Sequence, residues 1–340
     1  MIFDRPNISI IIPVYNEENY IAACLDSMLE SDYSNDKMEI FVVDGGSEDR
    51  TIEIIQEYQT RHPFLKLLHN AKKIVPVAMN IAIKEATGEY IIRLDAHASY
   101  PKDYFSKLIE YHKKLDAQNV GAVIRTEVKN KTKKSLSIKE VLSHKLGVGN
   151  SNFRTGIESV QEVDTVPFGC YKKEVFEKYG FYDERLIRNQ DIELNKRIIN
   201  AGGKIYLIPE VECTYFAREN FKDLAKNNFA NGKWNILTAY YTKTLNSLSV
   251  RHFVPLLFVL SLIISALLAL CSPYFGIFGL VSMVSYLTLV IIISLKLRDN
   301  SNSFVYLVLS FLTLHLSYGV GSLVGIFKVI KIIFQRGKYE

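Results

Sequence analysis

The pair of residues best suited to chemistry is Asp95 and His97, which flank one small residue after an apolar run. In an extended stretch, residues two positions apart project to the same side. A carboxylate and an imidazole at a strand end suit a divalent cation that bridges the diphosphate of a nucleotide substrate. Asp-x-His alone is a weak motif. Two earlier predicted strands also end in acidic loops, with Glu17 and Asp44, and this repetition favours a shared site over isolated turn residues.

Apolar runs alternate with stretches of helical periodicity through the first 100 residues, which predicts an α/β fold with a doubly wound parallel sheet. In such a sheet, ligands bind beyond the carboxyl ends of the strands. The loops at 13–17, 44–47 and 95–97 are therefore expected to meet in one crevice. The predicted strands are 8–12, 39–43, 65–69 and 90–94; the predicted helices are 51–58 and 75–85, with an earlier one marked by Ile21, Cys24, Leu25 and Met28.

The middle of the chain has weaker patterning. Residues 130–164 are polar and show little periodicity, which indicates either a partly mobile loop over the site or an ordinary surface loop. Regular pattern returns with a predicted helix at 192–200, which Gly202 and Gly203 end, and a predicted strand at 204–208.

The C-terminal quarter has the composition of a membrane domain. Val254 to Leu295 contains no charged residue or histidine. A hydrocarbon core of roughly 30 Å takes about 20 helical residues, and three segments approach or exceed that length. Three crossings would leave the basic end of the chain on the side opposite the catalytic domain, against the positive-inside tendency. The predicted membrane domain is 251–340, with spans near 254–271, 274–295 and 304–327.

The segment before these spans mixes aromatic residues and lysines. A helix at about 217–250 with such a composition would lie in the plane of the lipid headgroups, although an ordinary core-packing helix is the alternative. The four cysteines are scattered and predict neither a zinc site nor a disulfide framework. No secretory signal is visible at the N-terminus, so the main domain is expected in the cytoplasm and the chain in the inner (plasma) membrane, as a multi-pass protein.

Charge excludes one class of partner. The formal net charge is +5, but from Val254 onward the chain carries six basic and two acidic residues, so residues 1–253 are close to neutral. A nucleic-acid-binding domain needs a basic face that neutralises phosphates. The sequence therefore argues against nucleic acid as a partner.

Three motifs in order carry a family resemblance: Pro13-Val14-Tyr15-Asn16-Glu17-Glu18, the stretch from Val42 to Thr51, and Leu94-Asp95-Ala96-His97. The chain resembles the family 2 glycosyltransferases over roughly residues 6–240. The resemblance implies a GT-A fold in a domain at 1–245, with a donor-binding half at about 1–100 and an acceptor half at about 101–245. It further implies a donor site of Pro13, Tyr15, Glu17, Asp44 and Asp95, in which Asp44 reads a uridine-type base.

The resemblance also implies a metal site. In most of the family the last motif is Asp-x-Asp, whereas in this chain His97 replaces the second aspartate. Asp95 and His97 are then expected to hold Mn²⁺ or Mg²⁺ on the donor diphosphate. An imidazole ligand shifts the preference toward Mn²⁺.

Asp191, at a predicted helix start, matches the position of the family's general base. An inverting transfer needs such a base to take the proton of the acceptor hydroxyl. The alternative is that Asp191 stabilises the helix N-terminus. Asp183 and Glu184 match an acceptor-side loop, where they order the loop or contact the acceptor. Lys233 and Trp234 stand where processive members carry Gln-x-x-Arg-Trp, which suggests contact with the diphosphate or acceptor in an enzyme that adds one sugar.

The combined features look similar to the succinoglycan-type glucosyltransferases of exopolysaccharide assembly. The expected function is inverting transfer of one hexose from a UDP-sugar to a polyprenyl diphosphate-linked saccharide in bacterial exopolysaccharide or capsule synthesis. Expected partners are the donor, the polyprenyl-linked acceptor, the membrane and a polysaccharide-assembly complex. The alternatives are a polyprenyl-phosphate glycosyl synthase and a non-catalytic scaffold in a membrane polysaccharide complex.

Overall fold

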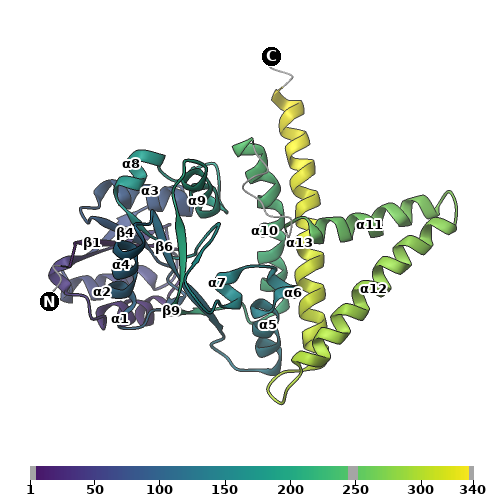
Figure 1. Ribbon diagram of the computed structural model, residues 1–340, viewed down its shortest axis with the longest axis horizontal. Helices are drawn as coiled ribbons and strands as arrows, with labels where there is room; N and C mark the ends of the chain where they lie inside the picture. Colours follow the sequence, from purple (N-terminus) through teal and green to yellow (C-terminus); the bar gives the residue numbers. More distant parts are fainter. Residues whose placement is uncertain (1–4, 244–251, 337–340) are drawn as a thin grey trace. The chain divides into compact units, whose positions relative to one another are not determined.

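The computed structural model describes residues 5–243 and 252–336 (Figure 1). Their contacts divide the chain into two compact units. Unit 1 comprises Met1–Arg125 and Asn152–Phe216, and unit 2 comprises Thr126–Ser151 and Ala217–Glu340. Unit 2 therefore draws on a segment that lies well before residue 245, where the sequence suggests the end of the catalytic domain. That domain boundary stays a prediction.

The first half of the sheet in unit 1 is parallel, as expected. Strand β1 (Ile8–Val14) lies between β2 (Met38–Asp44) and β4 (Tyr90–Arg93), and β3 (Leu65–His69) continues the sheet beyond β2. The isoleucine run is fully buried because helices cover both faces, as is usual for parallel sheets. Ile10 and Ile12 point into one core and Ile11 into the other, which is the period-two alternation of a strand.

The second half of the sheet is antiparallel, which the strand-helix alternation did not predict. Strand β8 (Cys170–Lys172) pairs antiparallel with β4 and with β6 (Asn119–Glu127). Strand β9 (Ile205–Phe216) pairs antiparallel with β5 (Ala98–Ser99) and β7 (Gln161–Glu162). Among the described residues the strand order is β3-β2-β1-β4-β8-β6-β9-β5, with β7 beside β9.

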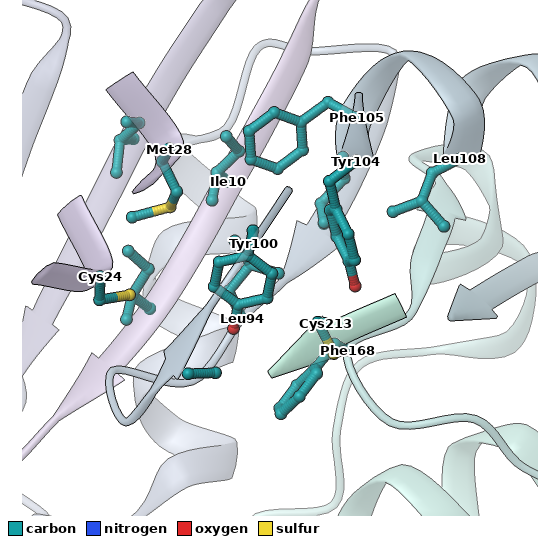
Figure 2. Packing of buried hydrophobic residues seen from close by; sticks show 14 of the residues in the cluster. Ile10, Cys24, Met28, Leu94, Tyr100, Tyr104, Phe105, Leu108, Phe168 and Cys213 are labelled. Carbon is teal, nitrogen blue, oxygen red and sulfur yellow. The ribbon is translucent and has the colours of Figure 1, made fainter. Parts of the chain in front are cut away.

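Two hydrophobic cores lie on the two faces of this sheet. One packs α1 (Ile21–Leu29) and α4 (Tyr104–Leu115) through side chains such as Cys24, Tyr104 and Phe105 (Figure 2). The other includes residues of α3 (Val75–Glu85) and α9 (Gln190–Asn200). The remaining helices of unit 1 are η1 (Asn35–Lys37), α2 (Thr51–Arg61), α7 (Asn152–Thr155) and α8 (Glu174–Tyr179).

Unit 2 is helical. A small core joins Val141 of α5 to Val290, Leu307, Phe311 and Leu314 of the C-terminal helices. The prediction of an irregular loop at 130–164 is therefore wrong for α5, which begins at a capping box between Thr132 and Ser135. The helices are α5 (Lys133–Ser143), α6 (Lys145–Val148), α10 (Phe221–Thr242), α11 (Val254–Ala269), α12 (Tyr274–Leu297) and α13 (Phe304–Arg336).

Two helices of the described residues, α12 and α13, are long and apolar enough to cross a membrane. The third expected span is shorter than predicted, because α11 has 16 residues. The helix expected at about 217–250 corresponds to α10, and residues 244–250 of that prediction lie outside the described residues.

Candidate active site

A cavity of about 200 Å³ opens at the carboxyl ends of the parallel strands, where the sequence places the site. Its walls come from the ends of β1, β2 and β4 and from the loop between β3 and α3. Five of the predicted site residues line it: Pro13, Tyr15, Glu17, Asp95 and His97. The other lining residues are Val14, Val43, Gly45, Asn70, Lys73, Ile74, Val75, Ala78, Arg93 and Ala96.

The buried Tyr100 side chain contacts both backbone polar groups of Asp95. The Tyr100 hydroxyl accepts a hydrogen bond from the Asp95 N–H (3.0 Å) and donates one to the Asp95 carbonyl (3.1 Å). Burial raises the pKa of Tyr100 well above its usual value, so this hydroxyl keeps its proton and remains a donor. These two hydrogen bonds fix the backbone of Asp95 at the cavity wall.

One arginine connects Asp95 to Asp191, the predicted base. Arg93 donates from Nη2 to Asp95 Oδ1 (3.0 Å) and from Nη1 to Asp191 Oδ2 (3.3 Å). Its side chain is 11% exposed, and those of the two carboxylates are 24% and 25% exposed. Burial acts to lower the pKa of Arg93, but the two carboxylates prevail and raise it. Sequence reasoning missed Arg93 because it reads as the last residue of a buried strand.

The imidazole of His97 contacts Glu17. The distance from His97 Nδ1 to Glu17 Oε1 is 3.2 Å, and both side chains are largely buried. Burial lowers the pKa of His97, but the hydrogen bond to Glu17, with Tyr215 and Asp95 nearby, raises it to about 9. His97 is therefore an imidazolium without metal, and a cation that binds it must displace a proton.

The donor set fits a divalent cation held partly by the substrate. No cluster of three or more metal-ligating side chains occurs among the residues described. One carboxylate oxygen of Asp95 accepts a hydrogen bond from Arg93, which leaves the other oxygen for a metal. His97 would supply a nitrogen. Cations in nucleotide sites are commonly bound by one or two protein ligands plus substrate phosphates. Asp95 and His97 offer one carboxylate oxygen and one nitrogen for such a site, and their binding of a cation stays a prediction.

Asp44 shapes the turn after β2. Its carboxylate accepts hydrogen bonds from the backbone N–H groups of Gly46 (2.7 Å) and Ser47 (3.1 Å). Gly46 has φ +79°, a conformation that favours glycine. Asp44 is 2% exposed, and recognition of a base by its carboxylate stays a prediction.

Lys73 is a further cationic residue of the cavity. It lies beside the turn, with Gly45 and Gly46 close by, and its Nζ lies 5.8 Å from the ring centroid of Tyr15. Lys73 has φ +57°, which is uncommon for a residue with a side chain. A lysine at a donor cavity suits a phosphate, although the sequence offers nothing that distinguishes it from an exposed lysine.

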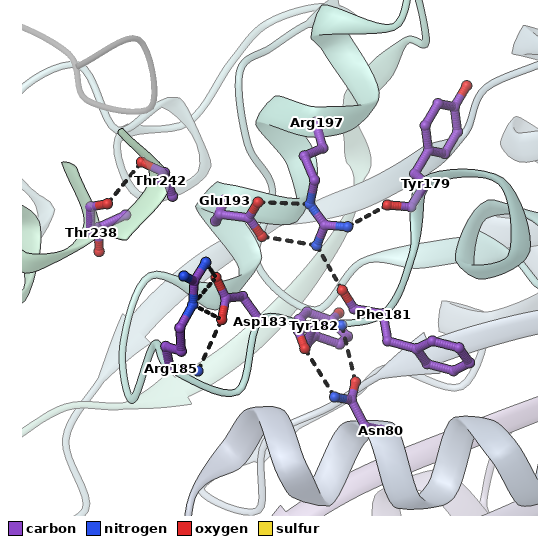
Figure 3. Close-up of polar contacts among 10 residues, drawn as sticks. All are labelled: Asn80, Tyr179, Phe181, Tyr182, Asp183, Arg185, Glu193, Arg197, Thr238 and Thr242. Carbon is purple, nitrogen blue, oxygen red and sulfur yellow. Dashed lines mark hydrogen bonds and ion pairs between the residues drawn. The ribbon is translucent and has the colours of Figure 1, made fainter. Parts of the chain in front are cut away.

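The loop before α9 is tied down by Asn80 of α3 (Figure 3). Asn80 donates to the Tyr182 carbonyl (2.9 Å) and accepts from the Tyr182 N–H (3.0 Å). Asp183 accepts from Arg185, and Glu184 pairs with Lys72 at 2.9 Å. These contacts support the ordering role for Asp183 and Glu184, and contact of Asp183 with the acceptor stays a prediction.

Other predicted residues have different surroundings. Glu193, two positions after Asp191, is buried and pairs with Arg197 (2.7 Å, Figure 3), so its carboxylate is already occupied by an ion pair. Lys233 and Trp234 belong to α10 of unit 2. Trp234 is 9% exposed, which leaves little ring surface for stacking. Their contact with the diphosphate or acceptor stays a prediction.

The sheet and the cavity define a GT-A glycosyltransferase that uses a nucleotide sugar. Residues 9–180 match the family described as Glycosyl transferase family 2. The chain belongs to this family.

Two curated relatives and one solved structure resemble the chain. A dolichyl N-acetyl-alpha-D-glucosaminyl phosphate 3-beta-D-2,3-diacetamido-2,3-dideoxy-beta-D-glucuronosyltransferase of Methanococcus voltae is 32% identical over 77% of this chain and 82% of its own. The succinoglycan biosynthesis protein ExoA of Rhizobium meliloti is 31% identical over 66% and 67%. The mannosyltransferase PcManGT of Pyrobaculum calidifontis, solved with GDP-Man and Mn²⁺, shares the fold with a TM-score of 0.60, at 17% identity over 96% and 88%.

Proposed function

We propose that the protein transfers one hexose from a UDP-sugar to a polyprenyl-linked saccharide, with inversion, during synthesis of an extracellular polysaccharide. The observation that carries this proposal is the Arg93 bridge, because it holds the predicted metal ligand Asp95 and the predicted base Asp191 on one guanidinium. The residue proposed to act at the donor diphosphate and the residue proposed to deprotonate the acceptor therefore contact the same guanidinium.

In the proposed reaction, Asp191 accepts the proton of the acceptor hydroxyl as the hydroxyl oxygen forms a bond to the anomeric carbon. The bond from that carbon to the donor phosphate breaks, and UDP leaves with the electron pair. Arg93 keeps the Asp191 carboxylate oriented and balances its charge. Lys73, which lines the cavity, binds the donor phosphates in this proposal.

A cation bound by Asp95 and His97 would neutralise charge on the leaving diphosphate. Tyr100 fixes the Asp95 backbone, and Arg93 fixes its carboxylate. The structurally similar mannosyltransferase was solved with Mn²⁺, which supports the use of such an ion here.

The acceptor part of the proposal has a separate basis. The printed name of the Methanococcus relative describes a dolichyl-phosphate-linked sugar as the substrate, and the Rhizobium relative is a polysaccharide biosynthesis protein. The apolar helices α12 and α13 suit an enzyme that meets its acceptor at a membrane. The uridine of the donor is inferred from the family resemblance.

The test is nucleoside diphosphate release by detergent-purified full-length protein over UDP- and GDP-sugars, with polyprenyl-linked saccharide and with or without Mn²⁺. We expect turnover with one UDP-sugar, loss of turnover without metal, and a fall of about 10²-fold or more in Asp191→Asn with UDP binding retained. Turnover that persists in Asp191→Asn on a polyprenyl phosphate would instead indicate a lipid-phosphate synthase. The absence of nucleotide-sugar binding would contradict the enzyme proposal.

A further inference from the structure

Helices α11 and α12 form a closely packed antiparallel hairpin. The rings of Phe258 and Tyr286 lie 4.3 Å apart, and the hydroxyls of Ser261 and Ser282 are 2.8 Å apart. Gly279 then allows Ser265 to approach, since a Cβ at Gly279 would lie 2.9 Å from the Ser265 Cβ. Small residues at a helix contact are typical of packing within membranes. Figure 1 shows the hairpin tip away from α13.

The hairpin surface is apolar around its tip. Leu270 is 84% exposed and Tyr274 is 77% exposed. No charged residue occurs between Val254 and Leu295. An exposed apolar surface of this extent is stable only if lipid or another protein covers it. Other exposed side chains are Leu257, Ile263, Ile264, Leu267, Leu268, Phe275, Ile277, Phe278, Leu280 and Val281.

Four N–H groups at the tip donate to carbonyls within residues 268–273. The N–H groups of Cys271 and Ser272 donate to the Leu268 carbonyl, at 2.9 and 3.1 Å. Further along, the Phe275 N–H donates to Ser272 (3.1 Å) and the Gly276 N–H to Pro273 (3.0 Å), while Pro273 has no N–H. Such internal pairing is compatible with hydrocarbon, where each unsatisfied backbone group costs several kcal/mol.

The two arms are unequal in length. With a rise of about 1.5 Å per residue, the 16 residues of α11 extend roughly 24 Å, which is short of a core of about 30 Å. The 24 residues of α12 extend roughly 36 Å, so a hairpin whose tip lies inside the core requires α12 to be inclined to the bilayer normal. At its base, the Pro255 backbone lies against Gly319 in the middle of α13. The other arm ends in a polar turn, in which Asp299 accepts from Ser301 and Asn302.

Helix α10 runs parallel to α13 from Tyr306 to Gly325. The ring of Phe221 lies 6.1 Å from that of Tyr306, and a Cβ at Gly325 would lie 2.8 Å from the Lys233 carbonyl. About 30 Å of α13 is therefore accompanied by a charged helix. Each charge at the bilayer centre costs roughly 2.5–3.5 kcal/mol, so the pair suits the membrane surface rather than the core. The charged residues of α10 are Lys222, Asp223, Lys226 and Lys233.

We propose that α11 and α12 are a re-entrant hairpin: the tip at Cys271 ends inside the hydrocarbon core, and the chain returns to the side from which it entered. Helices α10 and α13 then lie along that same surface. This arrangement keeps Lys328 and Lys331 on the side of the catalytic unit, which removes the conflict with the positive-inside tendency. The inference deepens the proposed function, because it gives the manner in which this enzyme holds to the bilayer of its acceptor.

The chain provides its own probe. Cys271 is exposed, whereas Cys24, Cys170 and Cys213 are buried. The experiment treats full-length protein, in sealed vesicles of each orientation, with a membrane-impermeant maleimide, before and after denaturation in detergent. Asn300→Cys and Lys331→Cys, each in a Cys271→Ser background, mark the turn after α12 and the end of α13. Cys271→Ser alone gives the baseline.

For the wild-type chain, we expect the reagent to give only baseline labelling from either side of the intact vesicles and to label Cys271 after denaturation, because a thiol in hydrocarbon does not form the reactive thiolate. The two introduced cysteines should react in intact vesicles from the same side. Labelling of Cys271 in intact vesicles from either side would overturn the proposal, as would opposite sides for the two introduced cysteines. The labelling requires no turnover. A result against the re-entrant hairpin is therefore distinguishable from a result against the proposed transferase activity.

Discussion

Replacement of Arg93 tests whether one side chain serves both halves of the reaction. Glutamine at this position cannot carry the charge that holds Asp95 and Asp191, and lysine retains the charge on a single ammonium that has no planar fork for two carboxylates. Loss of a residue that orients a metal ligand typically costs 10- to 100-fold in metal affinity or activity. We expect Arg93→Gln to lose about that factor in kcat and to require more Mn²⁺ for UDP binding, with Arg93→Lys in between.

The stability of this variant must be measured beside its activity. Removal of one partner from a buried ion pair costs roughly 3–5 kcal/mol, and the one-quarter exposure of both carboxylates reduces this to roughly 2–3 kcal/mol. Thermal unfolding in detergent gives that loss, and calorimetric titration of UDP with and without Mn²⁺ gives the ground-state effect. Arg50→Gln removes an exposed pair with Glu53 and is the matched control, for which no change is expected.

One result would exclude a positioning role for Arg93. If Arg93→Gln is folded and both its metal-dependent UDP affinity and its kcat stay within about twofold of wild type, the bridge has no role in positioning. If UDP binding is weakened but transfer per bound donor is unchanged, Arg93 positions Asp95 and has no role in positioning Asp191.

Three further predictions concern stability. Asn80→Ala removes both hydrogen bonds to the Tyr182 backbone and should lower the free energy of unfolding by about 2 kcal/mol, with unchanged thermal stability as the contrary result. Burial, with Lys172 nearby, lowers the pKa of His112 to about 4. The contribution of neutral His112 to the free energy of unfolding is therefore complete above pH 6.5, and up to about 3 kcal/mol of it is lost as the pH falls toward 4. The thermal stability of His112→Gln should depend less on pH in this range, and an equal dependence would contradict this prediction. A side chain at Gly321 would collide with the Phe229 carbonyl, so Gly321→Val should reduce the yield of monodisperse protein in detergent, and normal chromatography would contradict the α10–α13 packing.

Local pattern predicts the donor half of the fold well. The apolar runs before Glu17, Asp44 and Asp95 are continuous because both faces of those strands are buried, and the loops after them meet because parallel strands end at one edge. The antiparallel half was not predicted, because the pairing of β8 with β4 joins residues about 80 positions apart and no local period records it.

The parts of the site that the sequence did not reveal depend on distant contacts. Arg93 stands where strand residues are usually structural, and only its contact with Asp191 identifies it. Likewise, the sequence shows Asn80 only as a polar residue on a helix, and its role is visible only from its hydrogen bond with Tyr182, which is about 100 residues away. Helix α5 has few apolar residues in its own sequence, and its Val141 is buried by side chains from α12 and α13.

The placement of α5 in unit 2 also has a consequence in time. Val141 packs with Leu314, which the ribosome adds 173 residues later. At about 5–20 residues per second, synthesis of that stretch takes roughly 10–35 s. During this interval, unit 1 has all of its residues once Phe216 has emerged, whereas α5 still lacks the C-terminal helices that bury Val141. Assembly of this chain is therefore ordered by translation, with the last helix providing the surface on which an early one settles.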